Sequence, residues 1–461
     1  MNWNFQNSYT DLPSIYYSNV KPDNLENAQL LLFNNDLAEE LDLNFNGNQN
    51  DICNFLLGKK LNSNNFFSQA YAGHQFGHFT ILGDGRAILL GEHICNNNRY
   101  DIQLKGSGQT PYSRNGDGKA TLGSMIREYL ISEAMHYLQI PSTRALAVIT
   151  TGEKVLREKY EPGAILVRVA KSHIRVGTFQ FGSLLKNKEE FKTLVNYTIN
   201  RLFPQIKEKK EKYLIFFKKI CELQVHLIVN WMRVGFIHGV MNTDNMSLSG
   251  ETIDYGPCAF MDTYNPKTVF SSIDKQGRYS FENQSNIAFW NLARLAETFL
   301  HLIDGDEKYA IKKIEETLNE YKKIFEKSWS IMMSEKLNLD KNDNNNQLIK
   351  EFLDLLHVHK LDYTNTFIDL EQNRLDRKIF VNWLNKYSLF KKKKYTKINP
   401  LFIPRNHIIE KIINDSQEGN YGSLNEFNKI LKKPYNNNKI DKKFTREPLE
   451  NEKVYETFCG T

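Results

Sequence analysis

Residues 238–245 have the sequence His-Gly-Val-Met-Asn-Thr-Asp-Asn, and Asp-Tyr-Gly follows at residues 254–256. Alone, Asp-Tyr-Gly is a common turn. Asn and Asp side chains, however, carry the hard oxygen ligands that suit Mg²⁺, the cation that neutralises a bound triphosphate. Asp244 and Asn245 are neighbours whose side chains should diverge, so that one can serve a substrate and the other a metal.

Upstream of this stretch lie residue types that suit phosphate binding. Gly-Asp-Gly-Arg at residues 83–86 falls between two predicted strands, where backbone N–H groups can approach a phosphate and Arg86 can supply charge. Lys105 ends the next predicted strand. Glu128 lies within a predicted helix at residues 121–138, at a position that suits an ion pair with Lys105.

Glycine loop, strand lysine, helix glutamate, metal-binding Asn and Asp-aromatic-Gly occur in this order in protein kinases. The order predicts an α+β, protein-kinase-like bilobal fold, with a strand-rich N-terminal lobe and a mainly helical C-terminal lobe. Three consecutive antiparallel strands are expected at residues 79–82, 87–92 and 100–104, followed by strands at 145–151 and 164–170. Helices are expected at residues 28–43, 121–138, 184–202, 212–234, 287–303 and 308–333, with one β-type island at 246–253.

The composition bounds the function classes. The chain has 461 residues, 41% of them hydrophobic, and a net charge of +6, which is typical of a soluble globular protein of two or three lobes. This charge, without a long basic stripe, does not indicate nucleic-acid binding. The absence of a membrane-spanning apolar run or a secretory signal predicts a cytoplasmic protein without a membrane partner. The five widely spaced cysteines indicate neither a disulfide framework nor a zinc site.

Two other motifs fail on inspection. Gly118-Lys119 lacks the earlier glycine and the following Ser or Thr of a phosphate loop, since Ser113 and Ala120 occupy those positions. His74 and His78 have the spacing of helical zinc ligands, but the neighbouring glycines disfavour a helix, so structural histidines are expected.

The sequence resembles the selenoprotein O (YdiU) family of protein adenylyltransferases, which have a kinase-like fold with family-specific extensions. The resemblance rests on stretches at residues 5–9, 71–77, 103–108, 114–118, 238–245 and 458–461. It implies an N-terminal extension at residues 1–70, a nucleotide-binding lobe at 71–181, and a helical lobe with catalytic loop, metal site and tail at 182–461. It also implies that ATP binds in a flipped orientation and that AMP is transferred to Ser, Thr or Tyr hydroxyls of proteins, with release of pyrophosphate.

The resemblance assigns roles residue by residue. Nucleotide and phosphate contacts fall on Gly83, Gly85, Arg86, Lys105, Asp117, Gly118, Arg168, Arg175 and Asp254, and Glu128 orients the lysine. Asp244 matches the general base, and Asn245 and Asp254 match the metal ligands. Arg168 and Arg175 also flank a predicted strand end at Ala170, where two guanidinium groups can converge on one polyphosphate, although either arginine alone suits a surface position equally well.

Several alternatives remain open. A conventional protein kinase is the enzymatic alternative, and a nucleotide-binding pseudokinase scaffold is the non-enzymatic one. The metal is Mg²⁺ or Mn²⁺, UMP transfer from UTP is conceivable, and the protein partners include the chain itself through self-modification. Bacterial family members can tether the segment after Asp-Tyr-Gly to a C-terminal cysteine. Here Cys459 is present but residues 266–274 contain no cysteine, a departure from that redox pattern.

Overall fold

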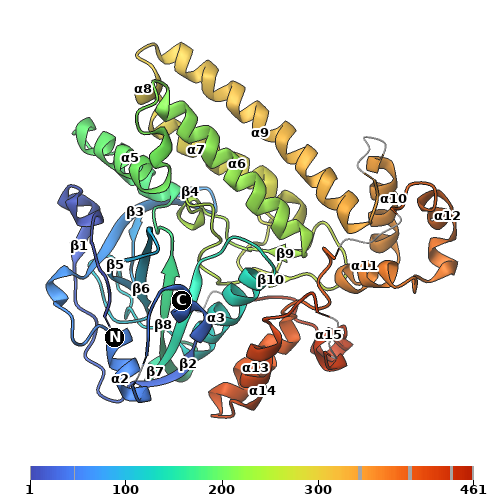
Figure 1. Cartoon of the computed structure of the whole chain (residues 1–461), viewed down its shortest axis with the longest axis horizontal. Coiled ribbons are helices and arrows are strands. Elements are labelled where there is room, and N and C mark those ends of the chain that lie inside the picture. The colour runs from blue at the N-terminus through green and yellow to red at the C-terminus, as the bar shows by residue number, and fades with distance from the viewer. Residues whose placement is uncertain (1, 46, 341–344, 393–396, 437–439, 459–461) are drawn as a thin grey trace.

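A computed structural model describes residues 2–45, 47–340, 345–392, 397–436 and 440–458 of the chain. The structure is α+β, with an antiparallel sheet on one side and most of the helices on the other (Figure 1). The sheet order is β1-β3-β5-β6-β8-β7-β2, and β4 pairs with β3 beside this path. The strands are β1 (Tyr17–Asn19), β2 (Gln29–Phe33), β3 (Phe67–Gln75), β4 (His78–Gly83), β5 (Ala87–Cys95), β6 (Asn98–Lys105), β7 (Arg144–Leu156) and β8 (Tyr160–Ala170).

The register of the central strands brings functional residues together. On β6, Lys105 lies opposite Ala87 of β5 and Leu166 of β8, while Gln103 lies opposite Arg168. Because side chains alternate between the two faces of a strand, Gln103 and Lys105 share one face. That face also carries Arg168, so strand pairing places Lys105 and Arg168 on the same face of the sheet.

Three local predictions were wrong. Residues 28–43 form β2 and the short helix α1 (Asn35–Glu40) rather than one helix, because β2 pairs with β7 and the Asn34 side chain caps α1 by accepting from the Leu37 N–H. The strand predicted at 79–82 pairs with β3 and not with β5, so the three strands are not consecutive neighbours.

The third wrong prediction is the β-type island at residues 246–253. The described segment forms a turn whose backbone hydrogen-bonds with residues 141, 143, 174 and 176. It contains isolated β-bridges at Ser247 and Thr252 but no strand. Strand pairing occurs on either side of the island instead, between β9 (Phe236–Ile237) and β10 (Ala259–Phe260).

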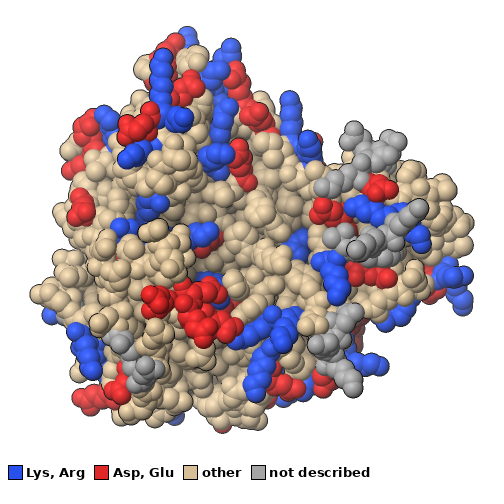
Figure 2. Space-filling model, viewed as in Figure 1, with Lys and Arg blue, Asp and Glu red and all other residues tan. Residues whose placement is uncertain are grey.

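The predicted helices of the second half are present with shifted ends, except that the one predicted at 287–303 is divided into two helices at Phe299. The helices are α2 (Gln49–Leu56), α3 (Leu122–Tyr137), α4 (Val176–Ser183), α5 (Lys188–Leu202), α6 (Lys212–Arg233), α7 (Gln284–Thr298), α8 (Leu300–Ile303), α9 (Glu307–Lys336), α10 (Asn345–Val358), α11 (Tyr363–Glu371), α12 (Arg377–Tyr387), α13 (Asn406–Gln417), α14 (Gly422–Ile430) and α15 (Lys442–Thr445). None of the helices in the described part of the chain is both long and apolar enough to cross a membrane. On the face that Figure 2 shows, basic and acidic side chains are intermixed, particularly over the helices at the top of the view.

Helix α3 is enclosed by elements from distant parts of the sequence. One of its sides packs on β7 and β8, and the other packs on α13 and α14. The buried cluster includes Ile126 of α3, Ile409 of α13 and Phe427 of α14, and Arg127 forms an ion pair with Glu410. The C-terminal helices therefore fix the helix that carries Glu128.

Candidate active site

A cleft of about 550 Å³ lies between the sheet and the loops that follow α6. Every predicted site residue except Glu128 lines this cleft, and Glu128 lies directly behind Lys105. The lining residues predicted from the sequence are Gly83, Gly85, Arg86, Lys105, Asp117, Gly118, Arg168, Arg175, Asp244, Asn245 and Asp254. Residues that are far apart in the sequence thus meet in one cavity.

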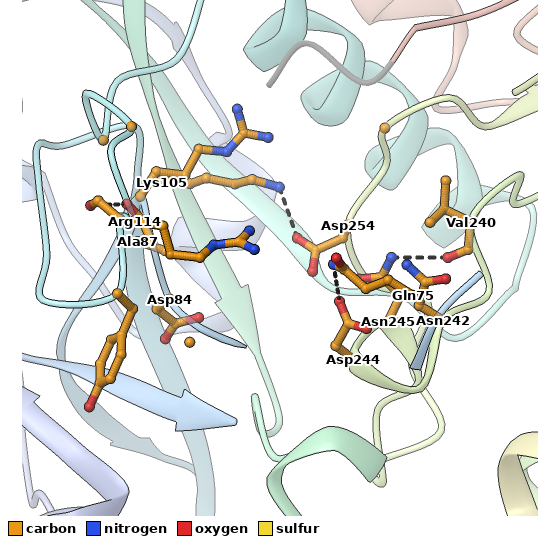
Figure 3. A pocket seen from close by; sticks show the side chains of 18 of the residues that line it. Gln75, Asp84, Ala87, Lys105, Arg114, Val240, Asn242, Asp244, Asn245 and Asp254 are labelled. Carbon is orange, nitrogen blue, oxygen red and sulfur yellow. Dashed lines mark hydrogen bonds and ion pairs between the residues drawn. The ribbon is translucent and has the colours of Figure 1, made fainter. Parts of the chain in front are cut away.

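Lys105 occupies the centre of the cleft wall. Its Nζ donates to Glu128 Oε2 at 2.7 Å and to Asp254 Oδ1 at 2.8 Å, and only 6% of its surface is exposed. The Lys105–Glu128 ion pair expected from the sequence is therefore present. Figure 3 shows the lysine side chain extended toward Asp254.

Two arginines reach the same carboxylate. Arg168 Nη1 lies 2.6 Å from Asp254 Oδ1, and Arg175 Nη1 lies 3.0 Å from Asp254 Oδ2. Burial alone would raise the pKa of the Asp254 carboxyl, but the charges of Lys105 and the two arginines outweigh it and hold this pKa well below its usual range. Three cations therefore converge on one point, which is an arrangement suited to a polyphosphate.

Sequence reasoning missed the residues that hold these arginines. Gln103 Oε1 accepts from Arg168 Nε at 3.1 Å, and Gln103 Nε2 donates to Asp84 Oδ2 at 3.2 Å. Burial raises the pKa of Asp84 to about 6, and the charge of Arg175, whose Nη2 lies 3.6 Å from Asp84 Oδ1, opposes this rise. The signal for Gln103 was its place two residues before Lys105, which puts it on the same face of the strand.

The carboxylate of Asp244 forms no ion pair with the three cations in the described part of the chain, although Arg175 Nη1 donates to the Asp244 backbone carbonyl at 2.9 Å. Asp244 sits in the short turn Thr243–Asn245, and Gln75 Nε2 lies 3.4 Å from its Oδ2 (Figure 3). Burial raises the pKa of Asp244 to about 6, while Arg175 and Gln75 act in the opposite direction. A carboxyl with this pKa is ionised at neutral pH and still able to take up a proton, which suits a general base.

The candidate metal ligands carry hard oxygen donors. Asn245 Nδ2 donates to the Val240 carbonyl at 2.9 Å, so its amide oxygen is the atom that it offers to a cation. The described residues contain no group of three or more His, Cys, Asp or Glu side chains that forms a complete metal site. Asn245 and Asp254 therefore fit a cation that takes its remaining ligands from phosphate oxygens and water, as Mg²⁺ commonly does.

The glycine turn is closed by the loop at residues 112–118. Ser113 Oγ donates to the Gly85 carbonyl at 2.5 Å, and a Cβ on Gly83 would lie 2.3 Å from Tyr112 Cγ. Glycine is required at residue 83 because the Tyr112 ring occupies the space of a side chain. Asp117 lies at the rim, where its carboxylate pairs with Arg157 at 2.8 Å.

Other residues singled out in the sequence lie outside the polar centre. His238 is fully buried, and its Nε2 bonds with the Ile253 carbonyl at 2.9 Å, so it is a structural histidine. His74 bonds with Gln180 of α4, whereas His78 is exposed at the start of β4. Cys258 is buried beside the cleft. Cys459 lies outside the described residues.

The chain is similar to known proteins over its whole length. Residues 1–382 match the family model described as protein adenylyltransferase SelO. The chain is 48% identical over 481 residues to "Protein nucleotidyltransferase YdiU" of Pelagibacter ubique, covering 100% of this chain and 99% of the relative. The proteins of the same name from Brevibacillus brevis and Clostridium perfringens are 48% and 46% identical, each covering 100% of this chain and 98% of the relative.

Proposed function

This chain belongs to the SelO family of protein adenylyltransferases, and we propose that it transfers AMP from ATP to Ser, Thr or Tyr hydroxyls of proteins, releasing pyrophosphate. It is a protein nucleotidyltransferase, as its full-length relatives are named. The observation that carries the finer proposal is the convergence of Lys105, Arg168 and Arg175 on Asp254, beside a second carboxylate, Asp244, with which none of the three forms an ion pair.

The three cations receive the triphosphate. The three side chains share Asp254 as a partner, and the phosphate oxygens would replace this carboxylate. Lys105 is held in place by Glu128, and Arg168 by Gln103. Because these donors are already oriented, they would stabilise the charge that grows on a pyrophosphate leaving group with little rearrangement.

Asp244 acts as the general base. Alignment with the kinase catalytic loop places Val240, an apolar residue, where kinases carry the catalytic aspartate. Val240 cannot accept a proton, whereas Asp244 can. The substrate hydroxyl oxygen then attacks the α-phosphorus in line, its proton passes to Asp244, and the bond from the α-phosphorus to the bridging oxygen breaks.

Asn245 and Asp254 would hold a divalent cation, Mg²⁺ or Mn²⁺. The bound cation would supply charge neutralisation at the phosphates. With the three cationic side chains bound to phosphates, both oxygens of Asp254 would be available for this ligation. Gly83, Gly85, Arg86, Asp117 and Gly118 line the remaining part of the cleft and would contact the rest of the nucleotide in the flipped orientation.

The same contacts support a protein-kinase-like bilobal fold, with the strand lysine, helix glutamate and metal aspartate in corresponding places. In this division residues 71–181 form the nucleotide-binding lobe, residues 182–461 form the helical lobe, and residues 1–70 form the N-terminal extension. Strands β1 and β2 of this extension join the sheet of the nucleotide-binding lobe. We also propose a cytoplasmic location, from the sequence alone.

The position of a radioactive label tests the reaction. The purified chain is incubated with Mg²⁺ or Mn²⁺, a mixture of acceptor proteins, and ATP labelled at either the α- or the γ-phosphorus. AMP transfer predicts protein-bound label from the α position only, and α-labelled UTP tests UMP transfer in parallel. Label from the γ position alone would establish the kinase alternative, and nucleotide binding without any transfer would establish the scaffold. Intact-mass measurement of the chain itself detects self-modification.

A further inference from the structure

The tip of the β3–β4 hairpin lies against the catalytic loop. The His74 N–H donates to Thr243 Oγ1 at 2.7 Å, and the Phe76 N–H donates to Asn242 Oδ1 at 3.0 Å. The two residues that precede Asp244 therefore each accept a backbone hydrogen bond from this hairpin. The contacting hairpin residues belong to the stretch 71–77, which the sequence analysis singled out and to which the proposed reaction assigns no role.

The contact is closest at Asp244 itself. A Cβ on Gly73 would lie 2.2 Å from Asp244 Oδ1 and 2.7 Å from Asp244 Cγ, so the carboxylate occupies the space that any other residue would fill. Gly73 does not have a left-handed φ, so the need for glycine here is steric. Asp244 Oδ1 is buried without a hydrogen-bond partner among the described residues, whereas Oδ2 accepts from Gln75.

Side chains from other elements hydrogen-bond to the residues that join the hairpin to the catalytic loop. Gln180 of α4 accepts from Thr243 Oγ1 at 2.6 Å and donates to His74 Nδ1 at 2.8 Å. The Tyr279 hydroxyl donates to Asn242 Oδ1 at 2.6 Å. The hairpin and the catalytic loop are thus joined through side chains from both halves of the chain, and neither can shift without breaking several hydrogen bonds.

We propose that Gly73 and Gln75 are positioning residues for Asp244, an inference that rests on the general-base role proposed above. The backbone at Gly73 packs directly against the Asp244 carboxylate and limits its movement. The Gln75 amide donates to Oδ2 and holds this oxygen on the side of the carboxylate that lines the cleft. The carboxylate is thereby limited to one orientation, with one oxygen against the Gly73 backbone and the other facing the substrate hydroxyl. A hairpin of the proposed nucleotide-binding lobe therefore orients a general base that belongs to the proposed helical lobe.

Gly73→Ala tests the steric contact between residue 73 and the Asp244 carboxylate. The added methyl should displace the carboxylate and lower kcat about 10²-fold, the effect expected of a displacement of about 1 Å, while the Kd for ATP stays within about twofold of wild type. Gly305→Ala is the matched control, because nothing lies within 4 Å of the added Cβ. In an Asp244→Ala background, Gly73→Ala should lower the residual rate no further, since the group that it displaces is gone. A normal kcat, or a full further loss in that background, would overturn the inference.

Melting temperatures separate this inference from the proposed function. Gly73→Ala should lower the melting temperature more in the wild type than in Asp244→Ala, where two of the three crowded atoms are absent. Equal losses in both backgrounds would refute the contact even if AMP transfer is observed. If no AMP transfer is found, the proposed function fails, while this comparison still reports on the contact.

Gln75→Leu tests the amide. The variant keeps the side-chain bulk but removes the donor, so kcat should fall while the KM for ATP is unchanged. His78→Ala is the matched control, because His78 lies opposite Gln75 on the hairpin and is exposed. A rise in the KM for ATP with an unchanged kcat would instead assign Gln75 to nucleotide binding and refute its positioning role.

Discussion

Asp254→Asn isolates the charge on which the three cations converge. Asp254 has a φ of 60°, in the left-handed region, and asparagine tolerates this backbone as well as aspartate does. The substitution therefore removes the negative charge without straining the chain. It leaves Lys105, Arg168 and Arg175 close together, with Glu128, Asp84 and Asp244 as the remaining anions nearby.

The size of the effect follows from the burial of these groups. Removing one partner of a buried ion pair typically destabilises a protein by about 3–5 kcal/mol. With an unfolding entropy of about 2.1 cal/mol/K per residue, a chain of 461 residues should then melt about 3–5 °C lower. Inorganic triphosphate should raise the melting temperature of the variant more than that of the wild type, because it replaces the missing anion.

Calorimetric titration of ATP supplies the second measurement. In EDTA the variant should bind ATP at least as tightly as the wild type, because Asp254 no longer competes with the phosphates for Lys105 and the arginines. Added Mg²⁺ should tighten ATP binding to the wild type alone, since the variant lacks the metal-binding carboxylate. Asp36→Asn, which removes a surface carboxylate beside Lys432, is the control and should melt within about 1 °C of the wild type. If Asp254→Asn melts like this control and loses ATP binding in EDTA, the reasoning is refuted.

Three further predictions concern the same cleft. Lys105→Ala and Glu128→Ala should be non-additive in a double-mutant cycle on initial rates, because the pair acts as one unit, and fully additive losses would mean that the two act separately. Since burial raises the pKa of Asp244 to about 6 and the base must be ionised, kcat should be level above this pH and fall about tenfold per pH unit below it, so a flat profile between pH 5 and 7 would contradict the role. Gln103→Leu should raise the KM for ATP by about 5- to 10-fold, because Arg168 loses an orienting hydrogen bond worth about 1 kcal/mol, whereas a changed kcat with a normal KM would be inconsistent with this role.

The site residues that could be predicted from the sequence are those whose type and local position suit few other roles. A lysine at a strand end, a glutamate in a helix of clear periodicity, and adjacent Asp and Asn before Asp-Tyr-Gly each limit what the chain can do there. Their order then limits the fold. The Lys105–Glu128 ion pair follows from these local patterns and is present in the structure.

The missed contacts depend on pairing between distant segments. Gln75 and Asp244 are 169 residues apart, and no periodicity along the chain records that they meet. Residues 28–43 were predicted as a helix because a short apolar run suits a helix and a strand equally well, and pairing with β7 decides between them. Asp84 lies in a glycine turn, where an aspartate is usually exposed, whereas here the fold buries it beside Arg175.

The enclosure of α3 has a consequence for how the chain is made. Arg127 of α3 and its partner Glu410 of α13 are 283 residues apart, so at a translation rate of about 5–20 residues per second the ribosome needs about 15–60 s to supply the second after the first. During that interval the apolar side of α3 that packs on α13 and α14 is uncovered on the nascent chain. A ribosome that stops before α13 would release a product with this surface exposed, which favours aggregation and capture by chaperones. Helix α3 and the sheet on which it packs, although they are translated first, are therefore among the last parts of the molecule to be completed.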